Sequence, residues 1–453
     1  MRRSLEATLR DAIRRGRLRA DTPLPSSRML ASDLGIARNS VVEVYGQLVA
    51  EGWLVARTGS RTVVGRRPDF TAASAQAAPV TAASPVTAFD LRAGRPDVSG
   101  FPRSAWLAAG RRALHMAAPE VFDYQKPAGR PELREMLAEY LSRVRGLQVQ
   151  ADRVIICLGA MHGLNLIGRT LRELGATTWA TESHGLAVHR RAAEKLGFML
   201  QIVPVDEQGA RVDHFGAADC VLLSPAHQFP LGVAMSAQRR HDAIEWAHTT
   251  NGILIEDDYD GEFRHDRRPV GALQALSPDR VIYVGTASKS LAPGLRIGWM
   301  VVPEHLREPL LRSKTLSDGH NSTFDQVTLA EFFRSGDYER HVRRDRLRYR
   351  RRLEQLMTTL AEFENVQVTG IAAGMHVLIR LPDGVKEDDV VARAGQRGLI
   401  VEGLTMYATA ITQAGSSHLV IGYGTPPDRA YPGCLRKLAE TLRELDLRPV
   451  NKK

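Results

Sequence analysis

Residues 286–298 read TASKSLAPGLRIG, and this stretch decides the fold of the chain. It follows an apolar run at residues 281–284 that is typical of a buried strand. Lys289 lies in the turn of small residues after that strand, and burial there lowers the pKa of its amine. Such an amine forms a Schiff base with an aldehyde. Arg296, seven residues later, offers a planar fork for a phosphate group.

A second stretch, GILIEDDYD at residues 252–260, reads as another buried strand that ends in carboxylates. In open α/β sheets, ligands bind at the carboxyl ends of the strands. Asp257 and Tyr259 lie two residues apart on an extended segment, so their side chains point to the same side. A molecule that needs an amine, a phosphate site, a carboxylate for a ring nitrogen and a hydroxyl for a ring oxygen is pyridoxal 5′-phosphate (PLP).

These residues in this order resemble the fold-type I PLP enzymes, the aspartate aminotransferase superfamily. The resemblance implies that Lys289 forms the Schiff base, Asp257 pairs with the ring nitrogen and Tyr259 contacts the ring oxygen. A further strand-like run at residues 154–158 is followed by small residues that open a helix, where backbone amides can hold a phosphate. The expected phosphate site comprises Gly159, Ala160, Met161, Thr286, Ser288 and Arg296. The resemblance also implies that Tyr124 reaches the phosphate of the other protomer's PLP.

Length and composition indicate ordinary globular material in two or three domains, with 453 residues, 43% hydrophobic and 25% charged. The chain has no run of 18 uncharged apolar residues and no secretory leader pattern at its start, so we expect no membrane span and a cytoplasmic protein. Three scattered cysteines form no disulfide framework and suit a reducing compartment. No spacing of residues predicts a metal site.

Positive charge gathers at the N-terminus. Residues 1–69 hold 13 Arg and no Lys against seven acidic residues, which is +6 of the total net charge of +10. A basic module on a nearly neutral body indicates a polyanion as the partner of that module.

Residues 1–64 predict two helices joined by a tight turn at Gly35, then a two-stranded wing. We expect Ser26 or Ser27 to cap the first of these helices, with Met29, Leu30 and Leu34 facing inward. The second helix, at residues 38–51, would bury the side chains of Val41, Val44, Tyr45 and Leu48.

This module resembles the GntR-type winged helix-turn-helix, through LPSSR at residues 24–28, LGIARNSV at 34–41 and EGWL at 51–54. The resemblance implies double-stranded DNA as the partner, with phosphate contacts from most of the approaching side chains and base contacts from Arg38 or Asn39. The residues expected near DNA are Arg28, Arg38, Asn39, Ser40, Arg57 and Arg61.

Residues 65–88 predict a flexible linker, because the stretch from residue 71 to 85 consists mostly of alanine, threonine, serine and proline and offers few core-forming side chains. From residue 89 to 453, apolar runs and helical segments alternate, which favours a mostly parallel sheet. We expect a large domain at about 120–305 and a smaller α+β domain formed by about 306–453 with 89–119. The full order of domains resembles the MocR/GabR-type transcriptional regulators, as do HQFP at residues 227–230 and EDDYD at 256–260. That resemblance implies a head-to-tail homodimer with one PLP per protomer.

Two positions depart from an amino-acid aminotransferase. Val420 stands where many relatives have an arginine that grips the substrate carboxylate, a contact that supplies about 1.5–3 kcal/mol elsewhere. The aromatic residue that stacks on the PLP ring is also replaced, so that Leu186 packs on the ring or His184 takes its place.

Both departures favour a regulator that senses PLP, or an amine effector that exchanges with Lys289, over an enzyme. The alternative is a working aminotransferase with an accessory DNA-binding module. A third hypothesis is a DNA-binding protein whose body no longer holds PLP.

Overall fold

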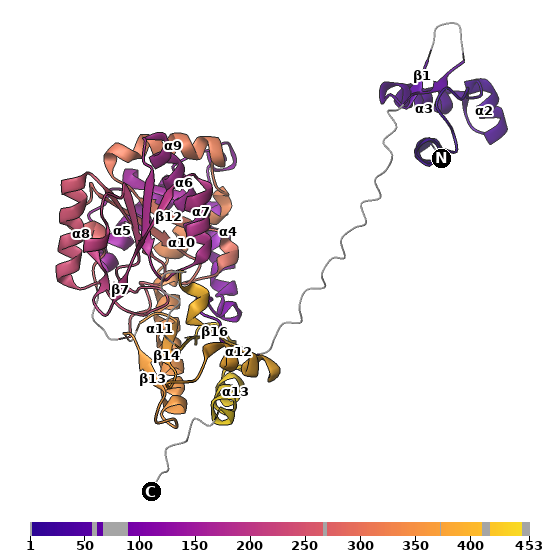
Figure 1. The fold of residues 1–453 in the computed structure, drawn as a ribbon. Coiled ribbons are helices and arrows are strands. Elements are labelled where there is room, and N and C mark those ends of the chain that lie inside the picture. Colours follow the sequence, from indigo (N-terminus) through magenta and orange to yellow (C-terminus); the bar gives the residue numbers. More distant parts are fainter. Residues whose placement is uncertain are drawn as a thin grey trace. The chain divides into compact units, whose positions relative to one another are not determined.

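The computed structural model describes residues 2–56, 61–66, 89–265, 270–371, 373–409 and 417–445. The chain divides into two compact units, Met1–Ser84 and Pro85–Lys453, and we call the second unit the body (Figure 1). Within the described ranges, no helix has the length and apolar character needed to cross a membrane.

The N-terminal unit contains three helices and a two-stranded antiparallel hairpin. These elements are α1 (Arg2–Arg14), α2 (Ser27–Leu34), α3 (Arg38–Ala50), β1 (Leu54–Val55) and β2 (Val63–Val64). Ser26 caps α2 by accepting a hydrogen bond from the Met29 amide at 3.2 Å, and Gly35 ends the helix at φ 62°. This left-handed turn strongly favours glycine. The predicted helix-turn-helix is therefore present.

The predicted buried face of α3 is confirmed, but the predicted buried face of α2 is partly wrong. Met29 is 50% exposed and Leu34 is 48% exposed, while Leu30 is half-buried. Ala31 is the buried residue of α2, and Met29 lies about 200° around the helix from it. Leu34 is the last helical residue before the turn. The small side chain of Ala31 sets the contact with α3, so the larger apolar residues lie beside the core.

The body is built on a seven-stranded sheet with the strand order β4-β12-β11-β10-β9-β5-β6. The strands are β4 (Val154–Cys157), β5 (Thr178–Glu182), β6 (Met199–Val203), β9 (Cys220–Leu223), β10 (Ile253–Asp258), β11 (Val281–Thr286) and β12 (Gly298–Val301). Only β12 runs antiparallel to its neighbours in this sheet, so the predicted mostly parallel sheet is confirmed.

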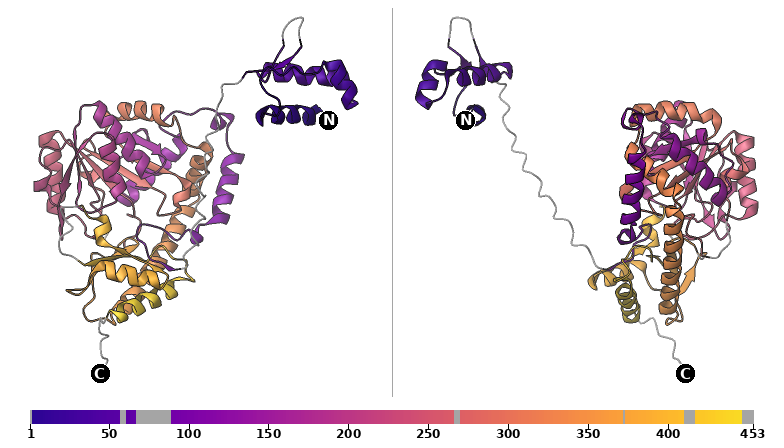
Figure 2. Two further views of the ribbon diagram at one scale, coloured as in Figure 1. Left: turned by 45° about the vertical axis from the view of Figure 1, so that its right-hand side comes forward. Right: turned by 180° about the vertical axis from the view of Figure 1, so that it is seen from behind.

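Helices cover both faces of this sheet (Figure 2). Along β11, Ile282 and Val284 join a core cluster with α6 (Ala160–Glu173), α7 (Ala187–Lys195) and α9 (Glu304–Ser317). The alternate side chains of the strands face the other helices, because successive residues of a strand point to opposite faces. Those helices are α4 (Arg103–His115), α5 (Pro131–Arg145), α8 (Ala237–Thr250) and α10 (Thr323–Arg334).

A second, antiparallel sheet of order β13-β14-β17-β16 forms the smaller part of the body. Its strands are β13 (Gln367–Thr369), β14 (His376–Arg380), β16 (Glu402–Gly403) and β17 (His418–Gly422). The parallel pair β3 (Phe89–Asp90) and β15 (Leu399–Ile400) lies with it, and so do the helices α11 (Asp337–Leu360), α12 (Glu387–Gln396) and α13 (Tyr431–Glu444).

The boundary between the large and the small part of the body lies later in the chain than the predicted residue 305. Leu306 and Leu310 of α9 pack with the core of the large sheet, as do Ala109 of α4 and Phe332 of α10. We expected these segments in the smaller domain. The apolar faces of these helices bury against the sheet. After α10 the chain enters the smaller core along α11, from Tyr349 onward, and that core also contains Leu91 and Phe263 from earlier segments.

Replacement of Leu48 by alanine should unfold the N-terminal unit more easily without changing the body. Leu48 is fully buried in a small core, so we expect the free energy of unfolding of that unit to fall by about 2–5 kcal/mol. Calorimetry of the full chain would follow the unfolding transition of the N-terminal unit and that of the body separately. Leu34→Ala is the matched control and should change stability by less than about 0.5 kcal/mol; an equal loss in both variants would contradict the corrected core.

Candidate functional site

The ends of three strands of the large sheet gather the predicted cofactor residues. Strands β10 and β11 are parallel neighbours, with Asp257 opposite Val284 and Asp258 opposite Gly285. The chain leaves β11 at Thr286 and reaches Lys289 three residues later. Strand β4 lies on the other side of β12, and Gly159 follows it at the start of α6. The position at the carboxyl ends of parallel strands is the one predicted from the sequence.

Lys289 presents a largely buried amine. Its Nζ donates a hydrogen bond to the carbonyl oxygen of Gly94 at 2.6 Å. Burial lowers the pKa of the amine, the charges of Asp257 and Asp260 oppose this, and the charge of Arg95 lowers it further. The amine therefore loses its proton more easily than an exposed lysine, which makes it a better nucleophile.

Asp257 places a carboxylate beside this amine. Its Oδ1 atom is buried and has no hydrogen-bond partner, which is unusual because buried polar atoms are nearly always paired. Burial raises the pKa of Asp257 to about 7, and the charge of Lys289 opposes the rise. Burial likewise raises the pKa of the neighbouring Glu182 to about 8, although Gln228 Nε2 donates to Glu182 Oε2 at 3.2 Å. A cationic N–H aimed at Asp257 would satisfy the free oxygen and favour its ionised form.

Tyr259 belongs to a hydrogen-bonded cluster that the sequence analysis missed. The hydroxyl group of Tyr259 lies 3.1 Å from Nδ1 of His227, and that nitrogen lies 2.8 Å from Oδ2 of Asp260. His376 on β14 packs against His227 with ring centroids 5.0 Å apart. One ligand atom from each of His227, Asp260 and His376 can be chosen so that all lie within 4.8 Å of one another. The three residues come from distant segments, and only His227 and Asp260 occur in motifs that the sequence analysis quoted.

The opposite end of the site has the character of an anion site. Gly159 precedes α6 at φ 96°, and no side chain caps the first turn, so the amides around Ala160 and Met161 stay open. A Cβ atom on Gly159 would lie 3.6 Å from Nη1 of Arg296, which shows that the guanidinium group reaches this turn.

Two hydroxyl groups complete this end of the site. The hydroxyl group of Thr286 donates to that of Ser288 at 2.8 Å and accepts a hydrogen bond from the Ser288 amide at 3.1 Å. Open amides, two hydroxyls and a guanidinium group are the groups that bind phosphate.

The segment expected to stack on a bound ring contributes histidines. Leu186 is exposed, while burial lowers the pKa of His184 to about 4. His189, in the first turn of α7, was not predicted, yet burial and the charge of Lys289 lower its pKa to about 4. The three residues stay alternatives for the ring-facing position. The sequence feature that could have pointed to His189 is its position three residues after Leu186, in the first turn of the helix that follows Leu186.

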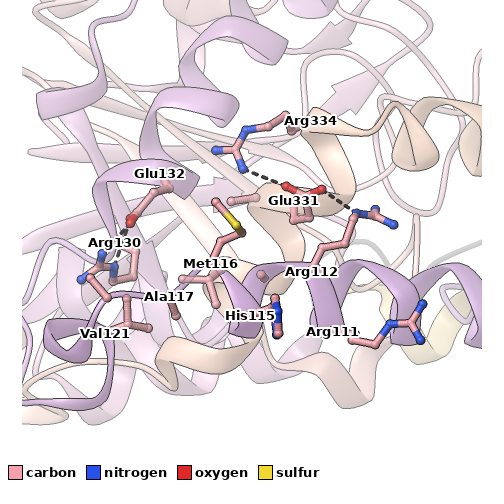
Figure 3. A pocket seen from close by; sticks show the side chains of 14 residues that line it. Arg111, Arg112, His115, Met116, Ala117, Val121, Arg130, Glu132, Glu331 and Arg334 are labelled. Carbon is pink, nitrogen blue, oxygen red and sulfur yellow. Dashed lines mark hydrogen bonds and ion pairs between the residues drawn. The ribbon is translucent and has the colours of Figure 1, made fainter.

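Tyr124 is 93% exposed, and its described ring contact is an edge contact with His320. A cavity of about 770 Å³ lies nearby between α4, α5 and α10, and contains none of the predicted cofactor residues. Figure 3 shows Arg112 and Arg334 on either side of Glu331 in this cavity, where both guanidinium groups donate to the same carboxylate. Met116 lines the cavity and is exposed. Three more exposed apolar side chains belong to the same part of the chain, namely Leu107 on α4, Phe122 next to the lining residue Val121, and Phe324 on α10.

The N-terminal unit presents a basic face around α3. Arg28, Arg38, Asn39 and Arg61 are exposed, and Ser40 is half-buried. In the described part of the chain, these three arginines have no acidic partner. No side chain caps α3, and its first turn contains no acid, so its amides can meet a phosphate. The sixth predicted residue, Arg57, lies outside the described residues.

The raised pKa of Asp257 predicts how the stability of the cofactor-free protein depends on pH. The folded state keeps a proton up to about pH 7, whereas the unfolded carboxyl group releases it near its ordinary value of 3.8. The free energy of unfolding should therefore fall as the pH rises between these values, and Asp257→Asn should weaken that fall. Urea titrations from pH 4.5 to 7.5 measure how the free energy of unfolding changes with pH. Asp383→Asn, a change at an exposed carboxylate, is the control; equal slopes in wild type and Asp257→Asn would contradict the assignment.

Comparison with known families divides the chain in the same way as the structure. Residues 2–64 match the bacterial regulatory proteins of the gntR family, and residues 87–430 match aminotransferase class I and II. The body is similar to the solved kynurenine aminotransferase of Pyrococcus horikoshii, with a TM-score of 0.70 and 26% identity over 79% of this chain and 91% of that chain.

Two relatives that match along both parts of the chain are named as regulators. The HTH-type pyridoxine biosynthesis transcriptional regulator PdxR of Corynebacterium glutamicum is 31% identical over 97% of this chain and 95% of the relative. The probable rhizopine catabolism regulatory protein MocR of Rhizobium meliloti is 31% identical over 87% of this chain and 84% of the relative. With two matching domains in one order and full-length relatives, the chain belongs to the MocR-type transcriptional regulators, in which a GntR-type DNA-binding domain precedes a class I and II aminotransferase domain.

Proposed function

We propose that this regulator holds PLP at Lys289 and changes its binding to operator DNA when it senses PLP or an amine effector. The observation that carries the proposal is the pair formed by Lys289 and Asp257. A buried amine of lowered pKa lies beside a carboxylate whose inner oxygen has no partner. These are the two groups that a pyridine aldehyde requires.

The other residues fit the same molecule. When bound, PLP supplies an aldehyde that condenses with primary amines and a ring that withdraws electrons from them. Asp257 would hold the ring nitrogen protonated, and Tyr259 would donate to the ring oxygen. The open first turn of α6, with Thr286, Ser288 and Arg296, would hold the phosphate.

The proposed unit of function is a head-to-tail homodimer. Tyr124 is exposed although its hydroxyl group is of the kind that binds phosphate, and exposed apolar side chains occur at Met116, which lines the cavity between α4 and α10, and at Leu107 and Phe324 on these two helices. Apolar patches of this kind mark interaction surfaces. In the dimer, Tyr124 would meet the phosphate site of the other protomer, and the apolar side chains would be covered.

Regulation then requires that the effector bind two states of the body with different affinity, because a ligand shifts an equilibrium only by that difference. Residues 65–88 would pass the change to the DNA-binding unit. The strongest test is footprinting on the upstream DNA of the protein's own gene, with and without PLP and candidate amines. Protection that is identical under all conditions would contradict the sensing role.

The alternative function is aminotransfer, with the N-terminal unit as an accessory. The structural likeness of the body to the kynurenine aminotransferase favours it. Val420 disfavours it, because this residue is buried in an apolar cluster where a carboxylate-binding arginine would be needed. Steady transamination of an amino acid at an enzyme-like rate, on the order of 1 s⁻¹ or faster, would establish the alternative.

Lys289→Ala should abolish covalent capture of PLP, because the described residues place no other lysine amine in this site. The wild-type protein should show visible absorbance and should keep the label after borohydride reduction, while the variant should show neither. Lys195→Ala, a change at an exposed lysine at the end of α7, is the control. A variant that still traps PLP at the same stoichiometry and responds to its inducer would overturn the proposal.

Arg61→Ala should weaken DNA binding through the loss of a phosphate contact. The slope of log K against log salt concentration should become shallower by about 1, with little change in the ratio of specific to non-specific affinity. Fluorescence anisotropy at several salt concentrations measures both quantities. Arg15, which is paired with Asp11 at 2.9 Å, gives the control Arg15→Ala, and an equal change in the two variants would contradict the interface.

A further inference from the structure

Val420 lies in the middle of β17, opposite Leu378 of β14 and Glu402 of β16. Its side chain is fully buried in a cluster that packs against Tyr259 and Leu231. The cluster consists of Ala93, Phe229, Leu378, Leu404, Tyr407 and Val420. The place where an aminotransferase would bind the carboxylate of its substrate is therefore filled with packed hydrocarbon. A carboxylate cannot enter it without losing its hydration.

A different segment borders the amine of Lys289. The carbonyl oxygen of Gly94 accepts the hydrogen bond from Nζ of Lys289, and a Cβ atom on Gly94 would lie 3.8 Å from the ring of Phe229. The hydroxyl group of Thr425 donates to the carbonyl oxygens of Arg92 at 2.6 Å and of Arg95 at 3.1 Å. The backbone that carries Arg95 is thus fixed on both sides, next to the reactive amine and the apolar cluster.

Arg95 and Arg92 have different surroundings, although they lie three residues apart. Arg92 forms a bidentate pair with Asp90, with contacts of 2.6–3.1 Å. Arg95 is exposed, and its side chain has no ion pair or hydrogen bond with any described residue. Its charge lowers the pKa of Lys289 and also that of Tyr407, so the guanidinium group lies within electrostatic reach of both. It is an exposed guanidinium group without a partner among the described residues, one residue after Gly94, whose carbonyl oxygen accepts the hydrogen bond from Lys289.

We propose that Arg95 binds the carboxylate of the effector, and that the effector is a primary amine that also bears a carboxylate. This inference rests on the proposed function, because the amine of the effector has to meet the cofactor carried by Lys289. The carboxylate points toward Gly94 and Arg95 instead of toward β17. Arg95 therefore replaces, from a different segment, the binding role that Val420 cannot fill.

The test compares carboxylated amines with the same amines lacking the carboxylate. The probes are L-alanine and β-alanine, each against ethylamine, and 4-aminobutyrate against propylamine. Each is titrated into the PLP-loaded full chain while the visible spectrum is followed. A charge-assisted bidentate contact predicts that at least one acid binds about 10- to 100-fold more tightly than its matched amine.

Arg95→Met should remove this preference by weakening the binding of the acid while leaving that of the amine unchanged. Arg95→Lys should restore part of it, because an ammonium group keeps the charge without the fork. Arg103→Met, a change at an exposed arginine at the start of α4, is the control and should keep the full preference.

Three results would overturn the assignment. These are the lack of any preference for the acids in the wild type, a preference that survives in Arg95→Met, and an equal loss of acid and amine binding in that variant. The proposed function is judged separately by PLP loading, measured from absorbance and borohydride trapping before any amine is added. Wild-type protein that does not load PLP defeats both proposals, whereas loaded protein that fails the comparison of acids and amines defeats only the role of Arg95.

Discussion

The burial of one amine is the constraint on which the rest of the body depends. Lys289 can keep a lowered pKa only if the strands around it exclude water and if its single hydrogen bond goes to a neutral carbonyl group. Gly94 supplies that carbonyl from a segment almost 200 residues earlier. The charges of Asp257 and Asp260 act in the other direction, because they raise the pKa that burial lowers. The pKa of the amine is therefore set by a balance between desolvation and two neighbouring carboxylates.

Much of this arrangement could be predicted, because the decisive residues are local in the sequence. The turn around Lys289 and the end of β10 around Asp257 and Tyr259 could both be predicted, because in each case an apolar run is followed by polar residues. The buried face of α3 follows from a helical period that no tertiary contact overrides. The order of the domains follows from motifs that lie within single segments.

What the sequence could not supply depends on contacts between distant segments. Met29 looks like a core residue until the contact between α2 and α3 forms at Ala31. The cluster of His227, Asp260 and His376 requires residues from both sheets of the body to meet, and no spacing in the chain encodes that meeting. The assignment of α9 and α10 to the large domain likewise depends on which core accepts their apolar faces.

Helix α11 has a mechanical consequence. Tyr338 and Val342 near its start are buried in the core of the large sheet, and Tyr349 and Leu356 farther along are buried in the core of the small sheet. A continuous helix of 24 residues spans about 36 Å and is stiff over that distance. The same rigid helix is therefore packed into both cores, so a tilt of its first turns against the large sheet would move its last turns and the small sheet. A shift at the start of α11 would in this way displace the smaller part of the body relative to the large sheet.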